Sequence, residues 1–451
     1  MPASAEDEAA RTREFEGAFP AERAPSGPVR EFAVTAAPAV VPLFDGRPVQ
    51  VWAYNGQVPG PTLRIRLGET LRVAFTNRLP QPSTIHWHGV RVPNRMDGVP
   101  GVTQPPVPPG GTFVYEFTPK DAGTFWFHPH VRASEQVERG LFGVLVVEDP
   151  SPPPYSRDVV WVLDDWLVTG RSEIDPSFNT THDLAHDGRW GNVITVNGDH
   201  EASLDVRPGE RIRLRLINVA NGRAFLPDFA GLDARAIAVD GMYAARPLDP
   251  SRLELAPGNR LDVDLTIPPD RVGQRLAVLD RFTQRPLRLA ELVVRGEVVP
   301  TPDFASPAAA KVPEWAGGEG APARLELRLN ARRGGPYGIQ WTLNDVAMDH
   351  DHGQGSAGAP PYRLPLGAWS KVRFTNESYR LHPMHMHGMF FKLLARNGRR
   401  VDEPHWRDTV LVGPKETVDV GLVPQDAGRW MVHCHILEHA ESGMMTLVEV
   451  R

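Results

Sequence analysis

The chain has 451 residues and a formal net charge of −6, which suggests about three domains of ~150 residues each. This balance provides no basic field for recruiting nucleic acid or an anionic membrane. The sequence contains no stretch of 18 apolar residues and therefore predicts no membrane-spanning helix. The single cysteine, Cys434, excludes an internal disulfide, so cysteine usage does not reveal the compartment.

The first twenty residues, MPASAEDEAARTREFEGAFP, are acidic and polar. They lack the charged-then-apolar pattern of a secretory signal. We therefore expect the chain as written to be cytoplasmic, or periplasmic or secreted if a signal has been removed. Residues 1–30 are expected to form an N-terminal arm.

Short apolar runs lie between abundant Pro and Gly residues, 45 and 41 of them. The segments TLRIRLGETLRVAFTN (62–77) and ERIRLRLINVAN (210–221) alternate apolar and polar residues. A period of two is typical of strands in antiparallel β-sandwiches. We interpret ASEQVERG (133–140) as a short helix.

One pattern occurs three times along the chain, in residues 55–77, 197–218 and 344–376, and the third copy carries an insertion. Each copy has a glycine turn and then a strand that ends in Asn77, Asn218 or Asn376. A second element also recurs, as PPGGTFVYEF, APGNRLDVDL and VGPKETVDVGL. The sequence predicts an all-β fold of three related sandwich domains, 31–150, 151–300 and 323–451, with a linker at 301–322.

The three copies differ in their histidines. HWHG follows nine residues after Asn77, and HMHG follows nine residues after Asn376. The segments PKDAGTFWFHPH (119–130) and PQDAGRWMVHCH (424–435) align without a gap. The middle copy has no histidine at either place, so the first and third copies supply matching sets, namely His86, His88, His128, His130, His385, His387, His433 and His435.

Each His-x-His pair can present two imidazoles in one direction, because residues i and i+2 of a strand point to the same face. If the first and third domains associate face to face, eight imidazoles can converge between them. Imidazole suits copper, zinc and iron. A hydrogen-bonded or surface histidine pair is the alternative for any one pair, but four pairs in register favour a metal site.

Cys434 lies on the opposite face of its strand from His433 and His435 and therefore serves a second site. The third domain also has His382, where the first domain has Ser83. His382, Cys434 and His439, with Met444 as a weak axial ligand, form the set of a blue-copper electron-transfer site. Met445 is an adjacent competitor for the axial role. The alternative is a buried inert cysteine among core methionines.

At the motifs HWHG, HPH, HPMHMHG and HCHILEHAESGM the chain resembles a three-domain multicopper oxidase of the bacterial laccase-like group, from about residue 30 onward. The resemblance implies cupredoxin-like Greek-key domains and four copper ions per chain. Type 1 copper would take His382, Cys434, His439 and Met444, and type 2 copper would take His86 and His385. The two type 3 ions would take His88, His128 and His435, and His130, His387 and His433.

The resemblance also implies catalytic roles for Cys434, which accepts electrons, and Asp97, which resembles the acidic residue that serves the trinuclear cluster. An aspartate in a turn before Gly98 is the alternative for Asp97. Related bacterial enzymes often carry a glutamate directly after the last type 1 histidine, where this chain has Ala440. Glu438 and Glu441 are the candidates to replace that glutamate in proton delivery.

The resemblance implies one-electron oxidation of phenols or aromatic amines coupled to four-electron reduction of O₂ to water. A metallo-oxidase acting on cuprous or ferrous ion is the second hypothesis. A copper-free structural relative is the third, but no ligand is missing. All motifs lie on one chain, so we expect a monomer.

Two further motifs have open interpretations. His350 and His352 in MDHDHG are either a fifth, labile metal site or part of a solvated loop. We interpret Arg407 and Asp408 in HWRDTV as a buried support pair without a catalytic role.

Overall fold

The computed structural model describes residues 5–16, 25–170, 173–229, 231–305, 321–348 and 362–451. These residues build six β-sheets in three consecutive pairs, with four short α-helices between or beside them. Among these residues, no helix is both long and apolar enough to cross a membrane.

The first pair of sheets uses residues 29–148. Its strands are β2 (Arg47–Tyr54), β1 (Val29–Leu43), β4 (Thr70–Asn77) and β6 (Thr112–Phe117) in one sheet, and β3 (Thr62–Arg66), β8 (Gly143–Glu148), β7 (Gly123–His128) and β5 (His86–His88) in the other. We call this pair unit 1. Since β1 begins at Val29, the first strand starts inside the expected arm.

The second pair, unit 2, uses residues 157–294. Its strands are β10 (Val193–Val196), β9 (Arg157–Trp166), β12 (Arg211–Asn218), β16 (Arg260–Thr266), β14 (Asp233–Val239) and β15 (Met242–Leu248), facing β11 (Ser203–Val206), β18 (Leu287–Val294), β17 (Arg275–Asp280) and β13 (Pro227–Asp228). Apolar side chains of both sheets form one buried cluster, which makes the unit a sandwich.

The third pair, unit 3, uses residues 325–450. Its strands are β20 (Ile339–Leu343), β19 (Leu325–Arg333), β22 (Ser370–Asn376), β27 (Thr417–Leu422), β24 (Lys392–Arg396) and β25 (Arg399–Arg400), facing β21 (Tyr362–Leu364), β29 (Met445–Val450), β28 (Gly428–Cys434), β23 (His382–Met386) and β26 (Thr409–Val412). Most of the expected linker, 306–320, lies outside the described residues, and the domain limits themselves stay a prediction.

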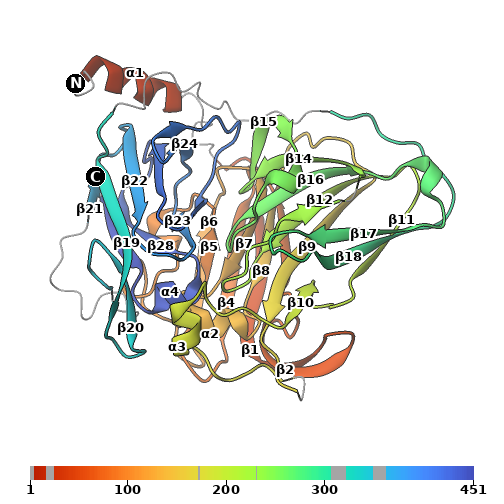
Figure 1. Ribbon diagram of the computed structural model, residues 1–451, viewed down its shortest axis with the longest axis horizontal. Coiled ribbons are helices and arrows are strands. Elements are labelled where there is room, and N and C mark those ends of the chain that lie inside the picture. The colour runs from red at the N-terminus through yellow and green to blue at the C-terminus, as the bar shows by residue number, and fades with distance from the viewer. Residues whose placement is uncertain (1–4, 17–24, 171–172, 230, 306–320, 349–361) are drawn as a thin grey trace.

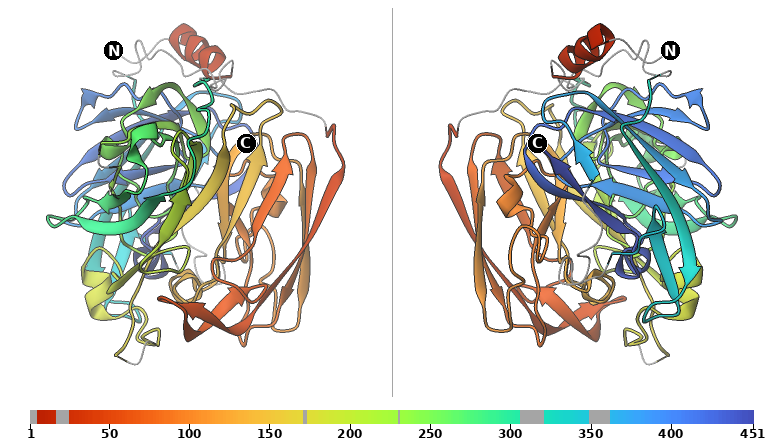
Figure 2. Two further views of the ribbon diagram at one scale, coloured as in Figure 1. Left: turned by 90° about the vertical axis from the view of Figure 1, so that its right-hand side faces the viewer. Right: turned by 90° about the vertical axis from the view of Figure 1, so that its left-hand side faces the viewer.

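The three units share one strand order, which confirms the all-β fold and the threefold repeat. In each, a strand of the repeat (β4, β12 or β22) pairs in parallel with the strand that opens the unit and antiparallel with the second recurrent element. Figure 2 shows the orange strands of unit 1 to one side of the green and blue strands of units 2 and 3.

The asparagine that ends each repeat strand fixes the loop behind it. The Nδ2 of Asn77 donates to the carbonyls of Gln81 and Val107, and its Oδ1 accepts from the Leu79 amide. Asn218 and Asn376 make the corresponding three bonds in their own units. In units 1 and 3 this loop leads to the His-x-His strand, so the asparagine positions that strand.

The alternation predicted for the repeat strands holds, but in β12 the polar face is not solvated. Every residue of β12 is buried, including three arginines. Each arginine pairs with a carboxylate, as Arg213 does with Asp262 at 2.6 Å and Arg215 with Asp158 at 2.6 Å. Arg215 also donates to the Thr124 hydroxyl of unit 1 at 2.7 Å. The polar face of this strand therefore joins two units.

Helices occupy the ends of the sandwiches. The expected short helix is present as α2 (Ala133–Glu138), and α4 (Leu437–Glu441) contacts both α2 and α3 (Thr181–Ala185). The arm contains a helix that the sequence pattern did not predict, α1 (Ala5–Glu16), which lies above β22 and β24 of unit 3 (Figure 1). Its Phe15 is fully buried, with its ring 5.3 Å from that of Trp406.

Candidate metal centres

The eight histidines of the matching sets lie together between units 1 and 3, and each is at most 5% exposed. His86 stacks on His387 with ring centroids 3.7 Å apart, and His88 stacks on His385 at 3.8 Å. Units 1 and 3 therefore meet in the way on which convergence depended, and all eight imidazoles lie in one place.

Ring nitrogens converge in several groups of three. The nitrogens of His130, His387 and His433, which the resemblance assigns to one ion, lie within 4.8 Å of one another. His435 of the second expected trio has its ring centroid 4.8 Å from that of His88 and 5.4 Å from that of His128. The rings of His86 and His385, the expected type 2 pair, are 5.9 Å apart.

Many of these buried nitrogens have no hydrogen-bond partner within the described residues. They include Nε2 of His86, His128 and His385, and both nitrogens of His435. A buried polar atom without a partner costs ~1–3 kcal/mol, so several at one place need a common ligand. Neutral imidazoles with unused lone pairs are the ligands that copper, zinc and iron accept, and the donor set fits such ions.

Burial also keeps the imidazoles uncharged. Desolvation lowers the pKa of His88, His128, His387 and His435 well below the ordinary value, and neighbouring histidines lower it further. Metal binding requires the neutral ring. Because these rings are already neutral at pH 7, protons do not compete with a metal ion for their nitrogens.

Asp97 lies against this histidine cluster and is buried. Its Oδ2 accepts from Nδ1 of His387 at 2.9 Å, and its backbone carbonyl accepts from Nδ1 of His86 at 2.8 Å. Both rings are thereby turned so that Nε2 faces the cluster. A carboxylate that orients two candidate ligands fits the outer shell of a metal site.

Asp408 of unit 3 is the counterpart of Asp97. The sequence pattern did not reveal this correspondence. The backbone carbonyl of Asp408 accepts from Nδ1 of His385 at 2.9 Å, and its Oδ1 lies 3.2 Å from Nε2 of His88. Each aspartate thus contacts one histidine of its own unit and one of the other. Asp97 follows His88 by nine residues and Asp408 follows His387 by 21, so equal spacing did not reveal the match.

Asp408 is buried and Arg407 is partly buried, but they do not form a pair with each other. Arg407 binds Glu403 at 2.7 Å, whereas Asp408 binds Arg260 of unit 2 at 2.6 Å. Arg407 and Asp408 therefore belong to different ion-pair networks. Of these two, the network of Asp408 contacts the histidine cluster.

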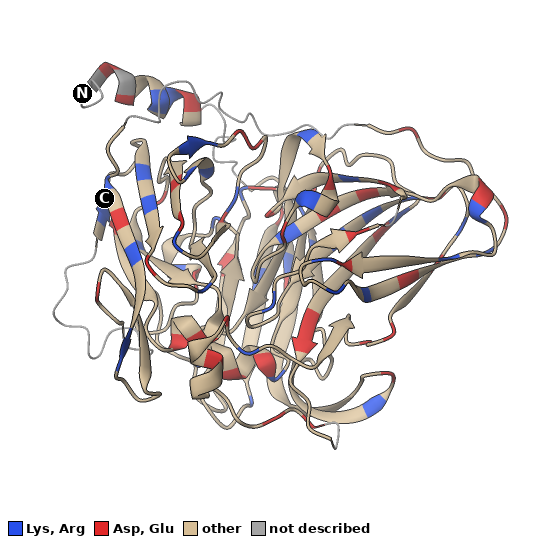
Figure 3. Ribbon diagram, in the orientation of Figure 1, with Lys and Arg blue, Asp and Glu red and all other residues tan. Residues whose placement is uncertain are grey.

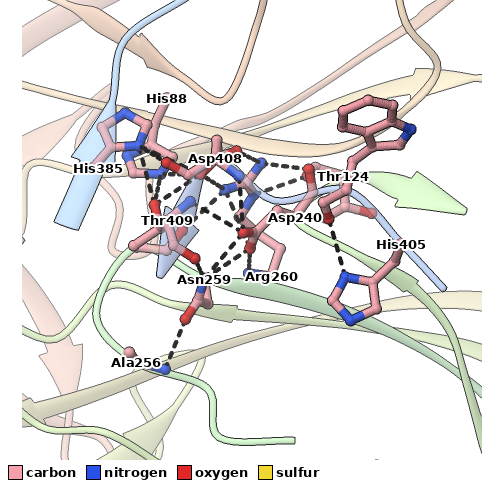
Figure 4. Close-up of polar contacts among 12 residues, drawn as sticks. His88, Thr124, Asp240, Ala256, Asn259, Arg260, His385, His405, Asp408 and Thr409 are labelled. Atoms are coloured by element: carbon pink, nitrogen blue, oxygen red, sulfur yellow. Dashed lines mark hydrogen bonds and ion pairs between the residues drawn. The ribbon is translucent and has the colours of Figure 1, made fainter. Parts of the chain in front are cut away.

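Unit 2 supplies no histidine to the cluster but holds Asp408 in place (Figure 4). Arg260 donates to both carboxylate oxygens of Asp408 and to the carbonyls of Thr124, Gly258 and Asp240. Burial alone would raise the pKa of Asp408, but the Arg260 guanidinium holds that pKa at about 2. The carboxylate beside His88 and His385 is therefore a fixed anion.

The second expected site is formed by His382, Cys434 and His439, all fully buried. Sγ of Cys434 lies 3.6 Å from Nδ1 of His382 and 3.8 Å from Nδ1 of His439, and the two nitrogens are 3.2 Å apart. Donors about 2.0–2.3 Å from a single ion have such separations. Without a cation, burial raises the pKa of the Cys434 thiol, so the thiolate form requires a bound metal.

The outer nitrogens of both histidines are used. Nε2 of His382 donates to the Ser378 hydroxyl at 2.9 Å, and Nε2 of His439 donates to the His186 carbonyl at 2.8 Å. Both rings therefore turn Nδ1 toward the sulfur. At the corresponding place in unit 1, Ser83 instead donates to Gln136 at 2.8 Å, and Pro129 replaces the cysteine.

The two methionines after α4 lie in different surroundings. Met444 is fully buried in the same apolar cluster as Cys434, and its carbonyl accepts from the Cys434 amide at 3.0 Å. Met445 packs in another cluster and lines a small cavity with His128, His130 and His433. The surroundings of Met445 are thus those of the eight-histidine cluster.

The candidates to replace a glutamate at Ala440 also separate. Glu441 lines the same small cavity as His128, His130 and His433. Glu438 instead accepts from Asn221 at 2.7 Å and from the Arg189 amide at 3.1 Å, and burial raises its pKa to about 7. His350 and His352 lie outside the described residues.

We predict that Arg260→Gln lowers the free energy of unfolding by about 3–5 kcal/mol at pH 7, because it leaves Asp408 and Asp240 buried without their cation. Because the pKa of Asp408 is depressed, its ionised form stabilises the native protein above the ordinary pKa of an aspartate. This stabilisation is lost only as pH falls through about 2. In the variant both carboxyls gain protons as pH falls, so the deficit should shrink from pH 7 to pH 4. Denaturant titration at each pH measures it.

Arg235→Gln is the matched control, because Arg235 pairs with Asp233 at 3.0 Å on the exposed surface of the same unit. We expect a loss below ~1 kcal/mol there at every pH. Equal losses in the two variants would contradict the role given to Arg260.

Comparison with known proteins gives one consistent family. Three models described as "Multicopper oxidase" match residues 38–152, 157–283 and 322–451. Multicopper oxidase MmcO of Mycobacterium tuberculosis is 30% identical, over 95% of this chain and 88% of its own length. A copper resistance protein A homolog of Pseudomonas syringae pv. tomato is 25% identical, over 88% of each chain.

Among solved structures, the multi-copper oxidase from Pseudomonas thermotolerans is 34% identical, with a TM-score of 0.84 over 94% of this chain and 99% of that one. Sequence and fold agree over nearly the whole chain. This chain belongs to the multicopper oxidase family and is a copper-dependent oxidoreductase.

Proposed function

We propose that the protein is a laccase-like oxidase that couples one-electron oxidation of phenols or aromatic amines to four-electron reduction of O₂ to water. It would hold four copper ions, which store and pass single electrons when bound. The type 1 ion takes His382, Cys434, His439 and Met444, type 2 takes His86 and His385, and the type 3 pair takes His88, His128 and His435, and His130, His387 and His433.

One observation carries this proposal: two donor sets share strand β28. Cys434 groups with His382 and His439, whereas His433, the preceding residue, groups with His130 and His387. The Nδ1 of His433 also donates to the Cys434 carbonyl at 2.8 Å. An electron accepted beside the sulfur can therefore reach the histidine cluster through one peptide unit or one hydrogen bond.

The division into domains at 31–150, 151–300 and 323–451 gives each unit a task in this proposal. The first and third domains hold the cluster between them, the third alone holds the type 1 site, and the second orients Asp408 through Arg260. Because every ligand lies on one chain, a monomer is sufficient.

Oxidation of cuprous or ferrous ion is the second candidate. The observation that favours it is the cover over His439, whose Nε2 is bonded to the His186 carbonyl rather than exposed to a phenol. The name of the copper resistance relative points in the same direction. A small cation needs less exposed surface than an aromatic ring.

The experiment that tests the proposal is oxygen uptake by the copper-loaded protein with a simple methoxyphenol, with and without added cupric ion. Rapid uptake without added copper supports the laccase-like function. Uptake that needs added copper, or that occurs only with cuprous ion as donor, replaces it with the metallo-oxidase function. No uptake with any donor would contradict both.

Met444→Leu and Met445→Leu form a matched pair for the axial ligand. We expect Met444→Leu to raise the reduction potential of the blue copper and alter its absorption, because the axial ligand tunes that site. Met445→Leu should leave both properties unchanged. Redox titration followed by absorption spectroscopy measures them, and the reverse pattern would assign the axial role to Met445.

We expect Asp97→Asn to slow oxygen reduction by about 10-fold or more while the blue colour persists, because Asp97 orients His86 and His387 but lies away from Cys434. Stopped-flow reoxidation of the reduced enzyme by O₂ measures the rate. Asp270→Asn, on the exposed surface, is the control. Unchanged turnover at all pH values would refute the role of Asp97.

A further inference from the structure

Two histidines outside both metal centres lie on the segment that covers His439. His182 is in α3 and His186 directly follows it, four residues apart. Their rings stack with centroids 4.3 Å apart and 22° between planes. Both side chains are exposed. Histidines four residues apart at a helix present two donors on one face, a spacing that binds metal ions.

The hydrogen bonds of His186 leave one ring nitrogen ready for a ligand. Its Nδ1 donates to the His182 carbonyl at 2.8 Å, so the proton sits on Nδ1 and the lone pair on Nε2. Ligand histidines commonly donate their other ring nitrogen to a carbonyl in this way. The bond thus fixes the tautomer of His186, and a small rotation of the stacked rings would bring both histidines to one ion.

A hydrogen bond connects the backbone of the pair to the expected type 1 site. The carbonyl of His186 itself accepts from Nε2 of His439 at 2.8 Å. Trp341 fixes the same segment by donating to the Leu184 carbonyl at 2.9 Å, with its ring 4.2 Å from that of His439. The path from the His186 imidazole to the His439 imidazole therefore runs through the backbone of His186 and one hydrogen bond.

The surroundings favour a cation. The carboxylate of Asp183 lies 3.8 Å from Nδ1 of His182. Acidic residues mark the neighbouring helices α2, α3 and α4 in Figure 3, but Glu135 and Glu138 of α2 are paired with Arg139 and Arg189. Asp187 adds a further carboxylate beside the pair and accepts from the Leu381 amide at 2.8 Å. A positive ion at the imidazoles is attracted by these charges.

We propose that His182 and His186 bind a cuprous ion and pass its electron to the type 1 site. The electron's destination rests on the proposed function, whereas the binding site does not. Four cuprous ions become four cupric ions, and the four electrons with four protons reduce one O₂ to two waters. Imidazole is among the ligands that suit copper, and because both rings are exposed the product ion can leave to solvent.

Silver ion is the probe for binding, because it shares the charge of cuprous ion and is not oxidised. Calorimetric titration of the copper-loaded protein should reveal a silver site whose affinity falls about 10-fold or more in His182→Ala and in His186→Ala. Both variants keep the backbone carbonyl that holds His439. Unchanged binding in both would overturn the site.

His200→Ala is the matched control. His200 is exposed and its Nδ1 donates to the Ile194 carbonyl at 3.0 Å, but within the described residues its ring stacks on no other histidine. We expect wild-type silver affinity in this variant. An equal loss in His200→Ala would mean that any exposed histidine gives the signal, and would overturn the pair as the site.

Kinetics test the electron transfer. In His182→Ala the ratio of kcat/KM for cuprous ion to kcat/KM for methoxyphenol should fall about tenfold. A ratio that stays at the wild-type value overturns the donor role, even if silver binds. If the wild type consumes oxygen with neither donor, the proposed function fails, while the silver titration still decides the site.

Discussion

The desolvation of eight imidazoles between two sandwiches is the constraint on which the rest of the structure depends. Buried rings must be neutral, and each then has one proton to donate and one lone pair to place. The backbone carbonyls of Asp97, Pro129, Asp408 and Cys434 each accept one such proton, from His86, His128, His385 and His433. The lone pairs that remain converge, which is the arrangement that metal ions stabilise.

Unit 2 has no histidine at the corresponding positions, yet the histidine cluster depends on this unit. Arg260 is fully buried and reaches across to Asp408, and Gly258 packs so closely that an added Cβ would lie 2.9 Å from the ring of His88. The positive φ of Gly258, +88°, also favours glycine there. Unit 2 therefore packs against the histidines of units 1 and 3 and fixes their positions.

The repeat was predictable because its information is local. Period-two alternation, the glycine turn and the terminal asparagine each act within a few residues, and all three units show them. The candidate ligands were predictable for the same reason, since each His-x-His motif spans three residues within one strand or at its end, although His130, His387 and His435 lie just beyond the strands. The match of Asp408 to Asp97 was hidden because β24 and β25 lie between His387 and Asp408, and the role of Arg260 was hidden because its partner lies 148 residues away. His182 and His186 gained meaning only when tertiary packing placed them over His439.

The cover over His439 limits which donors can reach the type 1 site. The His186 carbonyl takes the outer nitrogen of His439, and Trp341 packs against the ring. A donor outside the 181–190 segment is separated from His439 by this cover, and electron transfer slows with each added bond or gap. An ion held by the His186 ring starts inside that barrier. Under the proposed function a phenol donates its electron across this cover, whereas a cation at the proposed histidine pair donates through the backbone of one residue and the hydrogen bond of its carbonyl.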